Sequence, residues 1–466
     1  MDISFSARTD VGRVRENNED NFLVDRKMRL YVVADGMGGH AAGAVASATA
    51  VNVVREILVA QKPLMASYEA DRSQEQRKQI LKVMGSACRQ ACHRIHQRGL
   101  RNPSERGMGT TLSVLMLLAD RAFIAHVGDS RVYLLRDGAV HQLTDDHSLL
   151  ADMVKHGRIR SANEVDPRFR NAVTRAVGVH ETVEVDTLDL HVLPGDRFLL
   201  CSDGLTGYAD GPLLEQMMSK HKDEDELCDA LILHANQAGG VDNITAVVAT
   251  VRDAPLAEPE KVRLVLRALR GLTLFRYLSY AELLRIMNIA EERHVKKDET
   301  VFAKGDTGLD AYVILSGQIQ VQTSNVVVAV LDPGRHFGEM GLVDEKPRMA
   351  DAFATEDSWL QVIPRSAFYD MMRKNPQLAV KLLWSFIKAM TARLRLTTNE
   401  LTLTKQLFHA VSPEDFGRMP QEWLAPDDMG TRPPRGDVSI AEPMDDLPPR
   451  PTGRQTDPYA KVPALP

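Results

Sequence analysis

The sequence predicts an α+β protein in two parts: a sandwich of two antiparallel β-sheets flanked by helices, and then a small β-roll closed by helices. From Ile3 to Val248, many strand-like segments accompany a few long helical ones, unlike the regular alternation of a doubly wound sheet. Hairpin signals such as Ala119-Asp120 and Asp137-Gly138 join several of these strands, so we expect antiparallel pairing. Between His294 and Val362, short strands alternate with regularly spaced turn signals, which is typical of a small barrel or roll.

The first part contains apolar, β-branched runs of strand length and longer segments with helical periodicity. The expected strands are Ile3–Thr9, Asn21–Val24, Leu30–Ala34, Thr110–Leu118, Arg121–Val127, Arg131–Arg136, Val183–Leu190, Arg197–Ser202 and Ile244–Val251. The expected helices are Ala41–Gln61, Ser73–Arg98, Ser148–His156, Pro212–Ser219 and Glu224–Ala238.

Changes in composition divide the chain further. We expect a first domain over residues 1–252, a Pro-containing linker over 253–260 and a second domain over 261–403. The second domain begins with helices at Leu264–Phe275 and Tyr280–Ile289 and ends with a helical stretch from Ser366 to Leu403, broken near Pro376. Residues 412–466 are rich in proline and lack apolar periodicity, which indicates either a solvated disordered tail or a segment that docks on a partner.

Composition excludes several classes of protein. The 466 residues are 44% hydrophobic and 26% charged, with a net charge of −6, so a general affinity for nucleic acid is not expected. The four cysteines are too few for a disulfide framework and indicate reduced thiols. Met1–Thr9 does not resemble a signal peptide, and no apolar run of membrane-spanning length stands out. We therefore expect a cytoplasmic protein without membrane insertion.

Acidic residues recur beside glycine or asparagine at the ends of the expected strands of the first domain. The five elements are Asn18-Glu19-Asp20, Asp35-Gly36, Gly128-Asp129-Ser130, Ser202-Asp203-Gly204 and Asp242-Asn243. Each alone is typical of a turn or a helix cap. Together they can converge if the strands are antiparallel neighbours, and clustered carboxylates repel one another unless cations neutralise them. Oxygen ligands without cysteine favour Mg²⁺ or Mn²⁺ over Zn²⁺.

The same set of residues predicts a reaction. Two divalent ions can share a water, lower its pKa and clamp a phosphoryl oxygen. Arg15, five residues before Asp20, can contact the other phosphate oxygens through its planar fork. The residues therefore predict metal-assisted hydrolysis of a phosphomonoester.

Residues 1–252 resemble the bacterial branch of the metal-dependent protein Ser/Thr phosphatases, the PP2C-like or PPM family. The matching motifs, in family order, are Arg15-x-x-Asn18-Glu19-Asp20, Asp35-Gly36-Met37-Gly38-Gly39, Met108-Gly109-Thr110-Thr111, Val127-Gly128-Asp129-Ser130-Arg131, Leu143-Thr144-Asp145-Asp146-His147-Ser148, Ser202-Asp203-Gly204-Leu205 and Asp242-Asn243-Ile244-Thr245. The resemblance implies a sandwich of two antiparallel sheets flanked by helices, with phosphorylated proteins as substrates and a Ser/Thr kinase as a further partner.

The resemblance also implies a role for each site residue. Asp35 bridges two core Mn²⁺ or Mg²⁺ ions, the Gly36 carbonyl binds one of them, and Asp203 and Asp242 ligate the other. Asp129 joins Asp203 in a weaker third site. Glu19 and Asp20 act through metal-bound waters, and Arg15 holds the phosphate.

The proton donor to the leaving group is open. Some relatives carry a histidine directly after Asp-Gly, where this chain has Met37. His40, three residues further on, is a candidate substitute, and an ordinary histidine at the start of a helix explains it equally well. The segment Ile159–Val177 occupies the place of the family's mobile flap.

A second pattern in the first domain is less informative. Cys88, Cys92 and His96 share one face of an expected helix, as zinc ligands can, but zinc would need four well-placed ligands. A helix face that packs small thiols into the core explains this spacing better.

The second domain has its own candidate site. It consists of one turn with Gly338, Glu339 and Met340, followed by Arg348 and Met349. Such a turn could hold an anion and accept a hydrogen bond from a hydroxyl group. A surface ion pair would explain Glu339 and Arg348 as well.

The pattern from Lys261 to Leu403 resembles a cyclic-nucleotide-binding domain, with Phe337 to Ala350 as its phosphate-binding cassette. That resemblance implies that Glu339 binds the ribose 2′-OH, that Arg348 binds the cyclic phosphate and that the helices after Val362 form a lid. Cyclic GMP readers often carry Thr or Ser where this chain has Met349, which favours cyclic AMP. Asp351 would weaken phosphate binding if it pointed inward.

We expect a phosphatase regulated by a cyclic nucleotide. One alternative is a phosphatase-like protein that binds phosphoproteins without turnover. Another is an active phosphatase whose second domain is a non-sensing module, for example for dimerisation.

Overall fold

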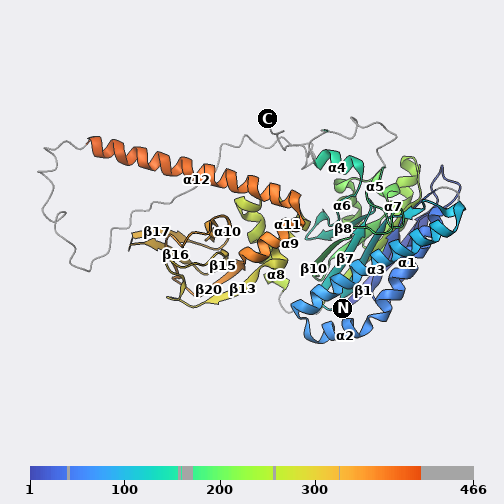
Figure 1. Ribbon diagram of the computed structural model, residues 1–466, viewed down its shortest axis with the longest axis horizontal. Coiled ribbons are helices and arrows are strands. Elements are labelled where there is room, and N and C mark those ends of the chain that lie inside the picture. Colours follow the sequence, from blue (N-terminus) through green and yellow to red (C-terminus); the bar gives the residue numbers. More distant parts are fainter. Residues whose placement is uncertain (39–41, 156–158, 160–171, 255–258, 325, 411–466) are drawn as a thin grey trace, which may run out of the picture. The chain divides into compact units, whose positions relative to one another are not determined.

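The computed structural model describes residues 1–38, 42–155, 159, 172–254, 259–324 and 326–410 (Figure 1). The chain divides into two compact units, Met1–Ser385 and Phe386–Pro466. The predicted tail, 412–466, lies outside the described residues.

The first part of the chain is the predicted sandwich of two antiparallel sheets. One sheet has the strand order β1-β12-β11-β8-β9, and the other β10-β7-β6-β3-β2. Their bounds are β1 Asp2–Asp10, β2 Asn21–Asp25, β3 Leu30–Ala34, β6 Leu112–Leu118, β7 Arg121–Val127, β8 Arg131–Arg136, β9 Ala139–Gln142, β10 Asp186–His191, β11 Arg197–Cys201 and β12 Ile244–Asp253. Every neighbouring pair is antiparallel, so the predicted fold class is confirmed.

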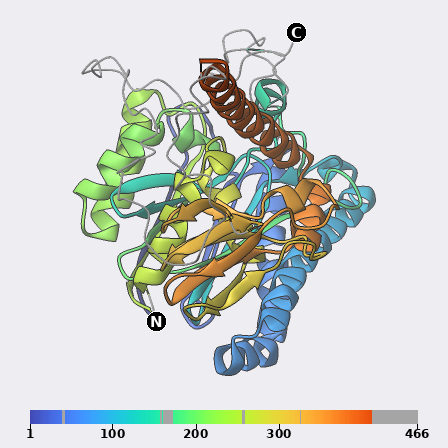
Figure 2. The ribbon, with the colours of Figure 1, turned by 90° about the vertical axis from the view of Figure 1, so that its left-hand side faces the viewer.

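Helices cover the outer face of both sheets. The helices of this part of the chain are α1 Ala42–Ala60, α2 Lys62–Asp71, α3 Gln74–Arg101, α4 Leu149–Lys155, α5 Asp203–Thr206, α6 Gly211–Lys220 and α7 Glu224–Ala238. α1 and α3 lie side by side and pack on β3, β6 and β7 (Figures 1 and 2), while α6 and α7 pack on β11 and β12. Because the strands are covered on both faces, β6 and β7 are buried along their whole length, and most of their residues are apolar.

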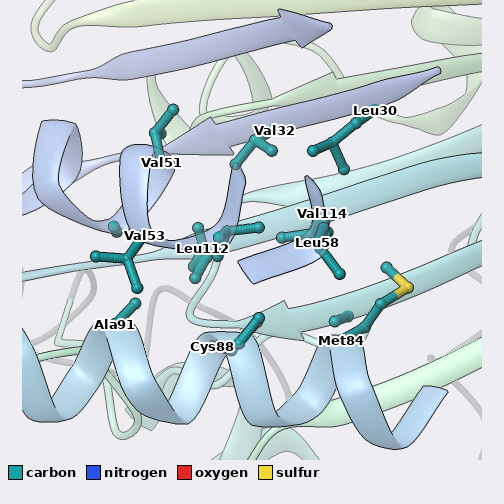
Figure 3. Close-up of a cluster of buried hydrophobic side chains, with 14 of the residues drawn as sticks. Leu30, Val32, Val51, Val53, Leu58, Met84, Cys88, Ala91, Leu112 and Val114 are labelled. Carbon is teal, nitrogen blue, oxygen red and sulfur yellow. The ribbon is translucent and has the colours of Figure 1, made fainter. Parts of the chain in front are cut away.

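Figure 3 shows how α1 and α3 fit this layer. Val51 and Leu58 of α1 and Cys88 of α3 point toward Val32 and Val114 of the sheet. Small side chains along both helices allow this close approach and bury a large apolar area, which is the main stabilising term of such a layer.

α1 corrects one expectation. By length and composition it could cross a membrane, with a mean hydropathy of 1.4 over its apolar window, although no such run was expected. Half of that window is buried inside the protein, as in a core helix of a sandwich.

Several elements differ from the prediction. The expected strand Thr110–Leu118 is split: β5, Gly109–Thr110, pairs with β4, Gly36–Met37, and β6 pairs with β3. The helix α2 and the edge strand β9 were not expected. The expected linker is shorter, because β12 continues to Asp253 and α8 begins at Pro259.

The second part is a roll of two four-stranded sheets, with the orders β13-β20-β15-β18 and β14-β19-β16-β17. The strands are β13 Glu291–Val295, β14 Thr300–Phe302, β15 Ala311–Ser316, β16 Ile319–Thr323, β17 Val326–Leu331, β18 His336–Phe337, β19 Asp351–Ala354 and β20 Ser358–Ile363. The helices are α8 Pro259–Gly271, η4 Thr273–Phe275, α9 Tyr280–Ile289, α10 Met340–Val343, α11 Arg365–Lys374 and α12 Pro376–Ala410. α8 and α9 do not belong to the roll alone, since Leu266 and Leu284 are buried in the same cluster as Phe198 and Val247 between the sheets of the sandwich.

Candidate active site

The acidic residues meet because of strand direction. Asp35 follows β3, Asp129 comes two residues after β7 and Asp203 comes two residues after β11, while Asp20 and Asp242 come just before β2 and β12. β2 is antiparallel to β3, and β12 is antiparallel to β11. The C-terminal end of one strand therefore lies beside the N-terminal end of its neighbour, and loops of both sheets meet at one edge of the sandwich.

Burial and mutual repulsion change the protonation of these carboxyl groups. Burial, and then the charges of Asp20, Asp203, Asp129 and Asp242, raise the pKa of Asp35 well above its usual value. Burial and the neighbouring carboxylates raise the pKa of Asp20 and of Asp129 to about 7. Such a cluster is costly without a cation, because each ionised carboxylate destabilises the others.

Two oxygens of the cluster lack a protein partner. Asp20 Oδ2 accepts hydrogen bonds from Ser202 Oγ (2.7 Å) and Thr245 Oγ1 (2.6 Å), whereas the buried Asp20 Oδ1 has no partner within the described chain. The buried Asp203 Oδ1 is likewise without a partner among the described residues. Buried oxygens of this kind are normally satisfied, so their chemistry fits divalent ions or the waters around them.

The backbone of Asp35 is fixed by the loop that splits the expected strand. The Thr111 N–H donates to the Asp35 carbonyl (2.8 Å), and the Asp35 N–H donates to Thr111 Oγ1 (2.9 Å). Thr110 Oγ1 also donates to the Asp35 carbonyl (2.8 Å). This pairing explains why residues 109–111 leave the strand, and it holds the carboxylate on rigid backbone.

Glu19, in the loop before β2, and Gly36, just after β3, both lie close to α1. The Glu19 N–H donates to Asn243 Oδ1 (2.8 Å), and Ser47 Oγ donates to the Glu19 carbonyl (2.6 Å). A Cβ on Gly36 would lie 2.2 Å from the Gly43 carbonyl oxygen and 2.5 Å from that of Glu19. Only glycine permits this approach of two backbones.

Arg15 lies at the same edge. Its Nη2 donates to Asp242 Oδ2 (2.7 Å), and this hydrogen bond raises the pKa of Arg15, with further contributions from Glu19 and Asp35. About half of the Arg15 side chain is exposed to solvent (53%), so the guanidinium can also reach a phosphate.

Within the described ranges, no group of three His, Cys, Asp or Glu side chains is close enough to hold an ion by itself. Mg²⁺ usually keeps several waters and binds through one or two carboxylates, so the donors present are the more useful criterion. The charges of the sequence-predicted Asp20, Asp129, Asp203 and Asp242 all act on Asp35, so the structure brings these residues together. His40 and most of the predicted flap lie outside the described residues.

Sequence reasoning missed three supporting side chains. Ser202 and Thr245 orient Asp20, and both lie inside motifs already singled out, next to Asp203 and shortly after Asp242. His147 fixes the Asp129 loop: its Nδ1 accepts the Gly128 N–H (3.1 Å), and its backbone N–H donates to the Gly128 carbonyl (2.8 Å). No spacing rule separates such supporting residues from ordinary polar ones.

The cysteine pattern is a packing feature. Cys88 is fully buried, Cys92 Sγ accepts the Gly178 N–H (3.3 Å) and lies 3.1 Å from the His180 carbonyl oxygen, to which it donates. His96 Nδ1 lies 3.3 Å from the Gly178 carbonyl oxygen. These groups hold the loop after residue 177 on α3, and burial raises the pKa of Cys88 to about 12, so its thiol stays protonated.

In the roll, Glu339 and Arg348 are both buried, which excludes the surface ion pair that was the alternative. Arg348 Nη1 donates to the Gly338 carbonyl (3.0 Å), Nη2 donates to the Asp310 carbonyl (2.7 Å), and the guanidinium lies 4.3 Å from the Phe302 ring centroid. Its buried Nε has no partner among the described residues, which fits an anionic ligand.

The remaining cassette residues differ in exposure. Met340 and Met349 are exposed, and Gly338 adopts a positive φ of 73°, where a Cβ would lie 2.8 Å from Arg348 Nη1. Asp351 Oδ1 accepts the Lys304 N–H (2.7 Å), so this carboxylate is engaged by the neighbouring turn.

Two family profiles match the sequence. The profile described as Protein phosphatase 2C matches residues 12–248, and the profile described as Cyclic nucleotide-binding domain matches residues 292–375.

The curated relatives below match about half of the chain. The serine/threonine phosphatase stp of Listeria innocua is 36% identical over 249 residues, which are 52% of this chain and 93% of that protein. The protein phosphatase PhpP of Streptococcus pneumoniae is 35% identical over 254 residues, which are 54% of this chain and 98% of that protein. The serine/threonine protein phosphatase PstP of Mycobacterium tuberculosis is 36% identical over 261 residues, 56% of this chain and 47% of that protein.

Solved structures also cover about half of the chain. The Mycobacterium tuberculosis phosphatase PstP/Ppp superposes with a TM-score of 0.47 and 34% identity, over 54% of this chain and 99% of that one. The catalytic domain of PstP in complex with two manganese ions gives a TM-score of 0.45 and 34% identity, over 54% and 99%.

Proposed function

The chain belongs to the protein phosphatase 2C family and is a protein serine/threonine phosphatase with a C-terminal cyclic-nucleotide-binding domain, and from this premise we propose which residues perform and regulate the reaction. The proposed reaction is the hydrolysis of phosphoserine and phosphothreonine in proteins, dependent on Mn²⁺ or Mg²⁺. The observation that carries it is the set of mutually repelling carboxyl groups with two buried oxygens, Asp20 Oδ1 and Asp203 Oδ1, that have no partner in the described part of the chain.

Asp35, Asp203 and Asp242 would hold two core ions together with the Gly36 carbonyl, and Asp129 would share a third ion with Asp203. Glu19 and Asp20 would bind through water. When bound, the ions supply an activated water and neutralise charge on the phosphoryl group.

The chain's own residues then position the substrate. Arg15 binds phosphate oxygens through its guanidinium, which exchanges its contact with Asp242 for the stronger charge of the phosphate. His40 is the proposed donor of the proton to the leaving alkoxide, in the absence of a histidine at Met37.

Phosphate release from phosphoserine and phosphothreonine peptides tests this assignment. Asp203→Asn should abolish Mn²⁺-dependent turnover, whereas Asp229→Asn, which breaks an exposed ion pair with Arg8, should leave it unchanged. Turnover by Asp203→Asn at the wild-type rate would contradict the metal assignment. Phosphopeptide binding by wild-type protein without turnover would support a binding protein instead.

The proposed regulator is a cyclic nucleotide, with cyclic AMP favoured over cyclic GMP. Arg348 would neutralise the cyclic phosphate, and Glu339 would accept a hydrogen bond from the ribose hydroxyl. Around them would lie Gly338, Met340 and Met349. The buried, unpartnered Arg348 Nε supports this proposal.

Calorimetry separates the alternatives for the second domain. Arg348→Ala should lose binding of cyclic AMP, and Arg373→Ala, which removes an exposed arginine of α11, should keep it. A wild-type protein that binds neither cyclic AMP nor cyclic GMP would make the domain a non-sensing module. Binding without any change in phosphatase rate would contradict the regulatory role.

The proposed setting is the cytoplasm, where a Ser/Thr kinase would produce the phosphorylated substrates. A single grid of phosphate release against metal and cyclic nucleotide measures the dependence on both ligands.

A further inference from the structure

A cavity of about 210 Å³ lies where α8 and α9 meet the β8–β9 hairpin of the sandwich (Figure 1). The hairpin contributes Arg136, Ala139 and His141 to its lining, and α9 contributes Tyr280. Neither the carboxylates of the candidate active site nor the residues of the nucleotide cassette line it. The cavity is therefore separate from both sites described above.

α8 supplies three arginines to the cavity. Arg263, Arg267 and Arg270 are four and three residues apart, so they share one face of the helix. Arg263 is neutralised, because its Nε donates to Asp137 (3.1 Å) and its Nη1 donates to Glu260 (2.6 Å). Arg267 and Arg270 are exposed and form no hydrogen bond or ion pair with the residues that the structure describes. Like charges so close on one helical face repel each other, so α8 brings two uncompensated positive charges to the cavity.

The opposite wall is held in place by buried contacts. Arg136 Nε donates to Asp196 Oδ1 (2.8 Å), and its Nη1 donates to the Tyr280 hydroxyl (3.0 Å). The Tyr280 ring stacks on His141, with 3.9 Å between ring centroids and 6° between the planes. Burial, and then the charges of Arg270 and Arg136, lower the pKa of His141 to about 4 from 6.5. The imidazole is thus neutral at pH 7, and the charge of Arg270 acts across the cavity.

Size and charge together select the class of ligand. The volume is smaller than the roughly 300–1,000 Å³ of pockets for drug-sized molecules, and several times the roughly 30 Å³ that a water occupies in the liquid. Guanidinium groups bind phosphate and carboxylate oxygens through pairs of parallel hydrogen bonds. An apolar ligand would leave the two arginine charges uncompensated.

We propose that this cavity binds a small anion with at least two negative charges, carried by phosphate or carboxylate groups, and that Arg267 and Arg270 are its main contacts. The bound anion lies between α8 and the β8–β9 hairpin and holds the helix on the sandwich. A ligand that binds the folded chain alone stabilises it. This site depends neither on the proposed catalysis nor on the proposed nucleotide regulation.

Calorimetry with inorganic diphosphate measures the binding. The parent is the full chain with Arg348→Ala, so that the cassette does not compete, in a chelator that removes metal from the carboxylates. It should bind one diphosphate per chain. Arg267→Ala with Arg270→Ala should raise the dissociation constant at least about tenfold, since both charge-assisted contacts are lost. Arg276→Ala with Arg373→Ala removes the same two charges from exposed positions outside the lining and should leave binding unchanged.

A second variant separates the cavity from its charges. Ala139→Phe fills part of the cavity and keeps every arginine, so it should weaken binding as well. Diphosphate should raise the unfolding temperature of the parent but not of this variant, whose own cooperative transition shows that it is folded. Citrate in the same titrations distinguishes the ligand groups: tighter binding of diphosphate assigns phosphate, and tighter binding of citrate assigns carboxylates.

Three outcomes would overturn the proposal. A parent that binds neither diphosphate nor citrate has no such site. Equal weakening by the Arg276→Ala, Arg373→Ala control would show a general effect of surface charge. Full binding by Ala139→Phe, or by Arg267→Ala with Arg270→Ala, would place the anion outside this cavity.

Discussion

At the scale of single residues, the side chains that orient the carboxylates matter as much as the carboxylates themselves. Asp20 receives both of its protein hydrogen bonds on one oxygen, from Ser202 and Thr245, and this leaves the other oxygen for an ion or its water. Supporting contacts of this kind usually affect metal affinity strongly.

Thr245→Val keeps the shape of the side chain and removes one of these hydrogen bonds. We expect the Mn²⁺ affinity to fall by about ten- to a hundredfold. Thr250→Val is the matched control: it lies on the same strand, and its hydroxyl accepts from Arg197 far from the site. Calorimetric Mn²⁺ titration of both variants measures the difference, and an equal effect in both would assign Thr245 to stability alone.

A second residue-scale prediction concerns acid stability. Burial, together with the nearby His147, lowers the pKa of His126 to about 4 from 6.5. The folded state disfavours the charged imidazole ring of His126. Above pH 6.5 the ring is neutral in both the folded and the unfolded state, so its titration does not change the free energy of unfolding there. As the pH falls from 6.5 toward 4, the unfolded state takes up the proton first and stability is lost by about 1.4 kcal/mol per pH unit.

Thermal unfolding at several pH values checks this dependence. His126→Gln should show a shallower loss of stability between pH 6.5 and 4 than the wild type, even if it is less stable at pH 7. Identical slopes would show that His126 titrates normally in the folded protein.

At the scale of elements, the close approach of α1 to the loop after β3 decides the geometry of the site. Gly36→Ala would place a Cβ within 2.2 Å of the Gly43 carbonyl oxygen. Since backbone must then move, we expect a loss of stability of about 1–3 kcal/mol and reduced activity.

Gly211→Ala is the control, because its added Cβ meets nothing within 4 Å. It should be nearly neutral in the same denaturant titrations. A fully active Gly36→Ala protein would contradict the packing of α1 against this loop.

The strands and long helices of the sandwich followed from apolar runs and periodicity, because burial on both faces leaves a strong signal in β6 and β7. The break at Thr111 did not, since it depends on hydrogen bonds to Asp35, 76 residues away in sequence. The carboxylates were recognisable from their position at strand ends, whereas Ser202 and Thr245 look like any buried polar residues. The attachment of α9 to the sandwich depends on contacts with residues far away in sequence, those of Leu284 in the core between the sheets and of Asn288 with Asp189, and no local pattern indicates these partners.

At the scale of the molecule, α9 connects the roll to the sandwich through partly buried polar contacts. Asn288 Nδ2 donates to the Asp189 carbonyl (2.6 Å), and Arg77 Nη2 donates to the Asn288 carbonyl (3.0 Å). At the other end of α9, Tyr280 stacks on His141 with 3.9 Å between ring centroids. Under the proposed regulation, we expect these contacts to carry the coupling between the two sites.

Asn288→Ala tests this route under the proposed regulation. We expect the nucleotide-dependent change in phosphatase rate to shrink while the rate without nucleotide is retained, because Asn288 lies outside the carboxylate cluster. Arg373→Ala is again the control for a surface change. If the nucleotide response of Asn288→Ala equals that of the wild type, coupling runs elsewhere.

The pairing of β1 with β12 has a consequence during synthesis. Asp2 lies opposite Asp253. The first strand of the sandwich therefore has no strand to pair with in its sheet until the last strand, β12, has been synthesised. Asp242 lies two residues before β12, so it is also synthesised late, after all the other carboxylates of the site. We expect a nascent chain released before residue 242 to lack both a closed first sheet and a complete set of carboxylates, so such a truncated product should be inert rather than an unregulated phosphatase.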